Sequence, residues 1–375
     1  MYIKGVGMTK FGISDKYSWQ LAYQATVDAL KDADMKFNDI DAVVCTSLEW
    51  FFSIEKQRHF ASMLSSMFQT NKPIVRVPAA CAGGGTALWT ANQLDYDNVL
   101  VVGVEKLMTC KSESITDEFM MAMESRWEQN EGINAPSSAA LVADEYLRKF
   151  PDTTTDDFDL IAYKSHENGY LNPHAKFYGK KVSIEQIKNS KIVASPLRLM
   201  HCSVSVDGAA ATILTKDKSD INIIGSDMCT DRMSPFERED PLVWEATSIS
   251  SKGALKQAGL GPSDIDFVEI HDAFSIVELI SYEDLGFAKK GEGAKLVRDG
   301  TVNLDGKMPI NSSGGLKAKG HPPSATGLSQ IYEIVKQLRG EAGDRQISQA
   351  NIGLAHNIGG VGGQVACNIL KKTRG

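Results

Sequence analysis

The sequence is poor in cysteine and contains no long apolar stretch. Its 375 residues include six cysteines, none in a Cys-x-x-Cys pair, at positions 45, 81, 110, 202, 229 and 367. This usage predicts reduced thiols in a cytoplasmic protein, and no metal site of the chain's own. No segment approaches the ~20 apolar residues of a membrane span, and the first residues lack the apolar core of a signal peptide. We therefore expect no membrane partner.

Positive charge is also in short supply. Forty Lys and Arg residues face 47 Asp and Glu residues, for a formal net charge of −7. No long basic block stands out, which argues against a nucleic-acid partner but leaves room for a local basic patch that holds an anionic ligand. A hydrophobic content of 42% is ordinary for a globular protein. At this length we expect two domains or one large fused body.

A hidden repeat indicates how that body is built. ALKDADMKFNDIDAVV (29–44) aligns without a gap to ALKQAGLGPSDIDFVE (254–269), with eight of sixteen positions identical. Each copy reads as a helix, a short acidic turn and a strand. A second, weaker similarity between the halves follows: Pro73-Ile74 and Pro309-Ile310 each lead into a Gly-rich segment. We predict two fused copies of one α/β unit.

The two copies set the expected domain boundaries. The first half spans residues 1–219 and the second spans 220–375. An insert of about residues 108–195 interrupts the first half, and a strand at 209–214 then returns to the first sheet. Several lysines make the insert locally basic, at positions 164, 176, 180, 181 and 191. They predict either a site for a phosphate-bearing ligand or a merely solvated surface.

One cysteine stands in a setting suited to chemistry. A β-branched run ending at Val77 breaks at Pro78, and small residues around Cys81 lead into a helical pattern that includes Leu88. Such an elbow presents sulfur near a helix N-terminus, where the dipole favours the thiolate. The glycines after it would let a substrate carbonyl approach the backbone amides. The alternative is that Cys81 is a small buried core residue.

Three histidines lie where sites gather in α/β folds, at strand ends and Gly-rich turns. His271 follows an apolar strand, His321 stands in a Gly-His-Pro turn, and His356-Asn357 leads into the Gly-rich turn at Gly359. A neutral imidazole near Cys81 would take its proton and leave a thiolate–imidazolium pair. Backbone N–H groups of Gly359 and of the Cys81 turn would then hold an oxyanion. Alternatively, each histidine is a satisfied structural group.

These motifs carry a family resemblance. Ala80-Cys81-Ala82-Gly83-Gly84 resembles the nucleophile motif of the thiolases, and GGLKAKGHPPSATG (314–327) resembles their glycine-histidine-proline motif. The likeness covers about residues 2 to 372. The chain is most similar to the sterol-carrier and archaeal branch, because His271-Asp272-Ala273-Phe274 stands where most members have Asn-Glu-Ala-Phe.

The resemblance implies a fold and a set of roles. The fold would be a five-layered α-β-α-β-α body of two fused pseudo-repeats, with an inserted CoA-binding loop domain. Cys81 would be the acylated nucleophile, which His321 activates while helping to form a first oxyanion hole, and His271 would hold the water of that hole. The amides of Cys81 and Gly359 would form a second hole. Coenzyme A and acyl-CoA would be substrates, with no permanently bound cofactor; the candidate CoA-binding residues are Lys164, His166, Lys176, Lys180 and Ser205.

The chain departs from the family at the second catalytic cysteine. Most thiolases have that cysteine at the position of Asn357, and some sterol-carrier-type members have it where Ala273 stands. The proton at the substrate α-carbon would then be handled by His321, by His356, by Asn357 as a polariser, or by water.

The resemblance also implies partners. Members of this branch associate with a small OB-fold protein that bears a zinc ribbon, and in some archaeal cases with a hydroxymethylglutaryl-CoA synthase. We expect such a small partner here, together with a homodimer or a higher oligomer.

The leading expectation for function is a thiolase that cleaves or forms a 3-oxoacyl-CoA. Glu49-Trp50-Phe51-Phe52, with Phe60, Met63, Met67 and Phe68, predicts either core or interface packing or an enlarged pocket for a bulky substrate such as benzoylsuccinyl-CoA. Acetoacetyl-CoA supply for isoprenoids is the competing role. A lyase on the same fold and a non-catalytic scaffold that binds CoA esters are the remaining alternatives.

Overall fold

The computed structural model describes residues 1–48, 55, 57–108 and 112–373. Within these residues, nine strands form one sheet whose two halves meet at a short ladder between β1 and β8. The first half runs in the order β3 (Ile74–Arg76), β2 (Ala42–Thr46), β4 (Asn98–Glu105), β7 (Gly208–Thr215) and β1 (Tyr2–Met8). The second half continues with β8 (Ile221–Thr230), β11 (Gln364–Lys372), β10 (Ile352–Gly359) and β9 (Phe267–Ile270).

The predicted repeat is confirmed strand by strand. β2, β4, β7 and β1 have their counterparts in β9, β10, β11 and β8, in the same spatial order. In the first half Ile74 pairs in parallel with Val43, and in the second half Ile310 pairs in parallel with Val268. The similarity between the two Pro-Ile segments therefore corresponds to equivalent positions at the outer edges of the two halves.

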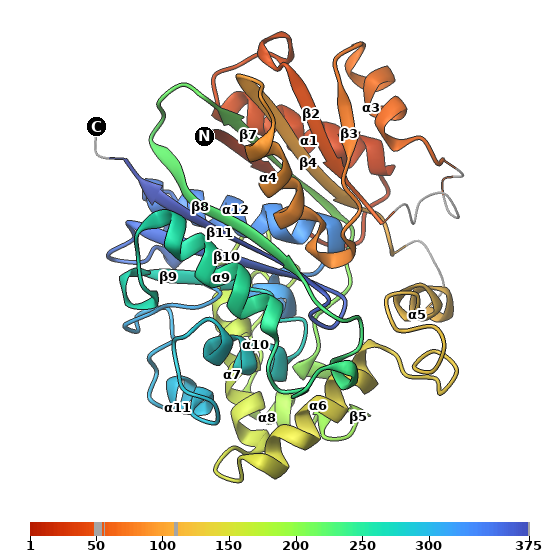
Figure 1. The fold of residues 1–375 in the computed structure, drawn as a ribbon, viewed down its shortest axis with the longest axis vertical. Coiled ribbons are helices and arrows are strands. Elements are labelled where there is room, and N and C mark those ends of the chain that lie inside the picture. Colours follow the sequence, from red (N-terminus) through yellow and green to blue (C-terminus); the bar gives the residue numbers. More distant parts are fainter. Residues whose placement is uncertain (49–54, 56, 109–111, 374–375) are drawn as a thin grey trace.

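The helices complete five layers, as the resemblance implied. The two inner helices, α4 (Gly83–Gln93) and α12 (Pro323–Arg339), pack on each other between the half-sheets. The first half is covered outside by α1 (Ser18–Asp32), with α3 (Phe60–Phe68) beside it. The second is covered by α9 (Glu245–Ala258), with α10 (Ser275–Asp284) beside it. Figure 1 shows the first half, in red and orange with the green strand β7, above the second half, in green and blue.

The segment between β4 and β7 folds mainly into helices, at the bottom of Figure 1. Its elements are α5 (Ser112–Met120), α6 (Ala135–Lys149), α7 (Thr155–Leu171), α8 (Ile184–Lys188) and a hairpin of β5 (Ile192–Ala194) and β6 (Leu197–Arg198). α7 packs against α10, against α11 (Gly293–Arg298) and against one turn of π-helix at Gly315–Lys319. The insert thus reaches the Gly-rich loop that precedes His321. No helix in the described part of the chain has the length and hydrophobicity needed to cross a membrane.

The inner helices cross at glycines. A Cβ on Gly84 of α4 would lie 2.8 Å from the backbone nitrogen of Gly327 in α12, closer than real Cβ contacts. Glycine here serves helix packing, whereas the sequence suggested that it serves access for a substrate carbonyl. Because Cys81 stands just before α4 and His321 just before α12, this crossing brings the start of both helices to the same region.

Candidate active site

The cysteine elbow exists, and its backbone is strained. Cys81 occupies a 3₁₀ turn (Ala80–Ala82) between β3 and α4, where the residue is partly buried. Ala80 has a φ of 45°, in the left-handed region that residues with a Cβ adopt at a cost of about 1–2 kcal/mol. Such strain persists where surrounding contacts enforce it, and it gathers at functional sites.

Those contacts come from the end of β10. The side-chain nitrogen of Asn357 donates to the carbonyl oxygen of Cys81 (3.1 Å), and its oxygen accepts from the backbone N–H of Gly85 (2.9 Å). A Cβ on Gly359 would lie 2.8 Å from the carbonyl oxygen of Ala79, so this turn needs glycine to pack on the elbow. Cys81 and Gly359, the two expected sources of oxyanion amides, are therefore close neighbours.

The two motif histidines lie side by side. His271 follows β9 directly, and its ring centroid is 5.1 Å from that of His321, with the rings almost perpendicular at 88°. Asn357 Nδ2 lies 3.1 Å from Nδ1 of His271. The structure thus links the backbone of Cys81 with Asn357, His271 and His321 in one chain of contacts.

A threonine missed by sequence reasoning sets the proton position on His321. Oγ1 of Thr326 lies 2.7 Å from Nδ1 of His321 and 3.1 Å from the carbonyl oxygen of Pro322, so the hydroxyl accepts from Nδ1–H of His321 whenever it donates to Pro322. The neutral ring then has an unprotonated Nε2, which is the form required of a base. Thr326 lies five residues after His321, in the first turn of the helix that follows. This spacing was the signal from which sequence reasoning could have found it.

The electrostatics keep the groups neutral before substrate binds. Burial lowers the pKa of His321 to about 4, although the nearby Asp272 carboxylate opposes the shift. Burial, and next the charge of Glu105, raise the pKa of Cys81 to about 12, against a hydrogen bond from the Gly360 amide. The raised pKa thus opposes the thiolate that the helix dipole was expected to favour.

Buried ion pairs tie the histidine loops together. In the π-helical turn before His321, Lys317 pairs with Asp272, and Lys319 lies 3.7 Å from Glu269 of β9. Ser313 donates to Glu269 through both its amide and its hydroxyl. Sequence reasoning missed these residues, because lysine normally indicates exposure.

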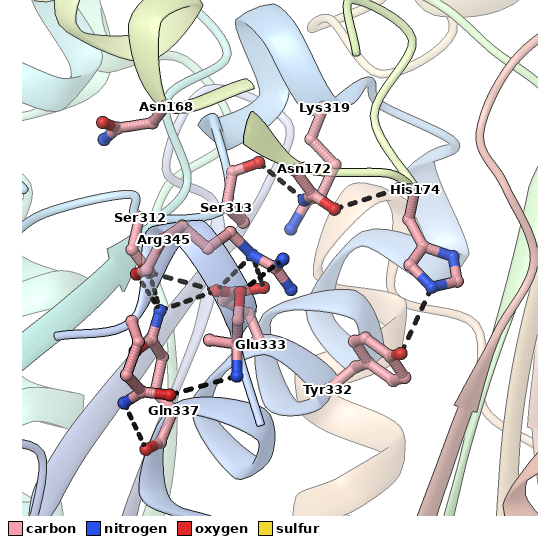
Figure 2. Close-up of polar contacts among 12 residues, drawn as sticks. Asn168, Asn172, His174, Ser312, Ser313, Lys319, Tyr332, Glu333, Gln337 and Arg345 are labelled. Carbon is pink, nitrogen blue, oxygen red and sulfur yellow. Dashed lines mark hydrogen bonds and ion pairs between the residues drawn. The ribbon is translucent and has the colours of Figure 1, made fainter. Parts of the chain in front are cut away.

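A second buried pair extends this network into α12. Figure 2 shows Arg345 against Glu333, with Nε 2.9 and 3.0 Å from the two carboxylate oxygens. From the insert, Asn172 donates to the carbonyl oxygen of Ser313 at 2.8 Å. Ser312 contacts both Glu269 and Glu333, so β9, the Gly-rich loop, α12 and the insert are joined by polar contacts.

Two predicted site residues lie elsewhere. His356 points to α9, where its Nε2 is 3.1 Å from the Thr247 hydroxyl, because neighbouring residues of a strand face opposite sides. Lys164 is buried, paired with Glu278, and donates to the carbonyl oxygen of Ile310 at 2.9 Å. The structure thus contradicts a proton-handling role for His356 beside Cys81, and it contradicts a contact between Lys164 and a surface phosphate.

The remaining candidates for CoA binding lie in three different places. His166 is buried with its ring edge-on to Phe177 (centroids 4.7 Å apart), and burial lowers its pKa to about 4. Lys176 and Lys180 line a cavity of about 440 Å³. Ser205 forms an isolated parallel β-bridge with His321.

Comparison with known proteins agrees with this architecture. Residues 1–218 match the family described as "Thiolase, N-terminal domain", and residues 228–372 match "Thiolase C-terminal domain-like". An acetyl-CoA acetyltransferase of Methanothermobacter thermautotrophicus is 39% identical, with 98% of each chain covered. Human sterol carrier protein 2 is 34% identical over 99% of this chain and 72% of its own length.

Solved structures show the same fold. The "Ltp2-ChsH2(DUF35) aldolase" superposes with a TM-score of 0.84 at 24% identity, covering 100% of this chain and 98% of that one. Human mitochondrial 3-ketoacyl-CoA thiolase does so with a TM-score of 0.73 at 17% identity, over 100% and 98%. Both halves of the sequence lead to one conclusion: this chain belongs to the thiolase family and is an acyltransferase whose substrates are coenzyme A thioesters.

Proposed function

We propose that the protein is a thiolase that cleaves a 3-oxoacyl-CoA with coenzyme A, or forms one in reverse, through an acyl group on Cys81. The observation that carries this proposal is the contact chain from Cys81 through Asn357 to His271 and His321. The Cys81 sulfur attacks the 3-keto carbon while Nε2 of His321 takes its proton. The amides of Cys81 and Gly359 hold the oxyanion of the thioester step, and free CoA then removes the acyl group.

The substrate we propose is a short 3-oxoacyl-CoA, with acetoacetyl-CoA as the first to test. Archaeal relatives that are 38% and 39% identical are named acetyl-CoA acetyltransferases. The aromatic-pocket alternative finds no support: residues 49–52 lie outside the described part, and the aromatic and methionine side chains of α3 pack with α1 on the outer face of the first half-sheet. A preference for an aryl 3-oxoacyl-CoA over acetoacetyl-CoA would reverse this choice.

The CoA phosphates are proposed to lie in the basic cavity beside Lys176 and Lys180. Lys10 and Lys16 also line it, and so does Phe11, which packs near Gly320, the residue before His321. Neutralising Lys176 and Lys180 should raise KM for CoA with little change in kcat, because phosphate contacts far from sulfur bind substrate and transition state alike.

The proposed assembly is a homodimer or higher oligomer with a small OB-fold partner that bears a zinc ribbon. The name of one structural neighbour, the "Ltp2-ChsH2(DUF35) aldolase", includes a DUF35 component. Co-expression with such a subunit should raise the yield and activity of this chain. Full activity of the chain alone, unchanged by the subunit, would count against the partner.

A lyase is the second candidate, since that same neighbour is called an aldolase. Retro-aldol cleavage needs no acyl-enzyme, so the intact Cys81 elbow favours the thiolase. The intact Cys81 elbow also argues against a third reading, a scaffold that only binds CoA esters. CoA-dependent cleavage of acetoacetyl-CoA separates the three. Cys81→Ser should abolish it, and His321→Ala should slow it by ~10²–10⁴-fold; cleavage that survives Cys81→Ser would overturn the proposal.

A further inference from the structure

The side-chain amide of Asn357 has only one chemically acceptable orientation. Its oxygen faces the backbone N–H of Gly85, a group that only donates, at 2.9 Å. Its nitrogen faces the carbonyl oxygen of Cys81, a group that only accepts, at 3.1 Å. Swapping oxygen and nitrogen would break both contacts at once, so two independent partners fix which atom faces the histidine.

That orientation determines the proton position on His271. The amide nitrogen has two hydrogens; one goes to Cys81, and the other points to Nδ1 of His271 at 3.1 Å. Nδ1 must therefore accept, and a neutral imidazole with Nδ1 as acceptor has its proton on Nε2. Both side chains are buried, so water does not compete for the contact. Burial, followed by the charges of His321, His356 and Lys317, keeps the pKa of His271 well below its ordinary value, which favours the neutral ring.

We propose that Asn357 is a positioning residue that holds His271 as the Nε2–H tautomer, so that His271 donates a hydrogen bond to the substrate oxygen and His321 is the base of both half-reactions. The inference rests on the proposed thiolase function and extends it to the division of labour between the histidines. His321, fixed by Thr326, presents a bare Nε2, whereas His271 presents an N–H. One ring accepts protons, and its neighbour 5.1 Å away donates hydrogen bonds.

A single proton carrier balances the reaction. In the first half, the Cys81 S–H proton moves to His321, the S–C bond forms at the 3-keto carbon, and the C2–C3 bond breaks. The electron pair of that bond leaves as the acetyl-CoA enolate, whose oxygen accepts from His271. The enolate carbon then takes the proton from His321. In the second half, the CoA thiol gives its proton to His321, CoA sulfur takes the acyl group, and the proton returns to Cys81. No acid is required at position 357.

The test is a double-mutant cycle. In Asn357→Asp the carboxylate only accepts, so the His271 proton moves to Nδ1 and Nε2 turns a lone pair toward the substrate oxygen. We expect kcat for acetoacetyl-CoA thiolysis to fall ~10²–10³-fold, the usual effect of losing one oxyanion donor. In a His271→Asn background the donor is an amide without tautomers. There, Asn357→Asp should lower kcat by less than about a tenth of the factor that it causes when His271 is present. Equal losses in both backgrounds would overturn the proposal.

Nuclear magnetic resonance reads the tautomer without relying on turnover. In protein labelled with ¹⁵N-histidine, His271 should have its proton on Nε2 in the wild type and on Nδ1 in Asn357→Asp. A wild-type ring protonated on Nδ1 would refute the inference even in an active enzyme. A correct tautomer in a protein that cleaves no 3-oxoacyl-CoA would instead remove the proposed function.

Asn368→Asp is the matched control. Asn368 is buried in the neighbouring strand β11 and also contacts α4, through the carbonyl oxygen of Gly85 (3.4 Å), but its oxygen is bound by Ser226. Asn368→Asp introduces a carboxylate at similar depth, and the hydrogen-bond partners of the Asn368 side chain are Ser226 and Gly85 rather than a histidine. The His271 signals should stay those of the wild type, and a shift of the same kind in this control would show that Asn357→Asp acts through general disturbance.

Discussion

Nζ of Lys317 lies 3.1 Å from Oδ2 of Asp272, and neither side chain is exposed to solvent. Lys317 also donates to the carbonyl oxygen of Asp272, while the carboxylate accepts from the backbone N–H of Leu316. Asp272 follows His271, and Lys317 lies four residues before His321. The pair therefore sets the distance between the two histidine loops.

Replacing Lys317 by Met should destabilise the protein by about 3–5 kcal/mol, because it leaves Asp272 buried and uncompensated. Urea unfolding monitored by fluorescence measures the loss. Lys295→Met is the control, since its pair with Glu292 is largely exposed and worth at most about 1 kcal/mol. Adding Asp272→Asn to Lys317→Met should recover part of the stability; a double variant no better than Lys317→Met would show that the charge is not the cause.

Gly84→Ala should unfold at a lower temperature. Its Cβ would lie 2.6 Å from the backbone nitrogen of Leu328 and would push α4 away from α12, a typical overpacking cost of about 1–3 kcal/mol. Gly12→Ala is the matched control, because nothing lies within 4 Å of its Cβ position. Calorimetry of both variants gives the comparison, and equal melting temperatures would contradict the close crossing of the two helices.

Thr326→Val keeps the shape of the side chain but removes the acceptor for Nδ1–H of His321. The ring then populates both tautomers, and kcat should fall about tenfold or more, within the ~10²–10⁴-fold that general-base catalysis contributes. KM for CoA should change little. Ser329→Ala, one turn further along α12, removes a hydroxyl that donates only to the carbonyl oxygen of Thr326 and should leave kcat near that of the wild type.

Stability should decline on the acid side of neutrality. Burial lowers the pKa of His321 to about 4 and that of His356 to about 3. A histidine in the unfolded chain has a pKa near 6.5. Below that pH the unfolded chain therefore binds protons at these positions, whereas the folded chain does not. The contribution of these two histidines to the free energy of unfolding is fully present above about pH 6.5. It is lost as the pH falls toward the pKa values that they have in the folded protein. Unfolding midpoints at pH 7, 6 and 5 measure the slope, which should be shallower in His356→Asn.

The layered fold and the cysteine elbow were accessible to sequence reasoning because both depend on local pattern. The repeat of eight identical positions in sixteen carries over into matching strands, and the strand-to-helix turn at Cys81 follows from Pro78 and the small residues after it. His271 and His321 were predictable for the same reason, since strand ends and glycine turns are where such sites form.

What sequence reasoning did not supply is set by contacts between distant segments. Asn357 reaches Gly85 across 272 positions, and no local pattern indicates that its amide is fully bonded. Lys164 was wrongly assigned to phosphate binding because its burial depends on which face of α7 meets Glu278. The error at His356 was avoidable: strand alternation already predicts that it and Asn357 face opposite sides.

The central claim is that Cys81 carries the acyl group, and the mass of the intact protein tests it most directly. Incubation with acetyl-CoA, followed by acid quench, should add one acetyl group, located on the Cys81 peptide and absent in Cys81→Ser. An unmodified protein that still cleaves acetoacetyl-CoA, or an acetyl group found on another residue, would contradict the account.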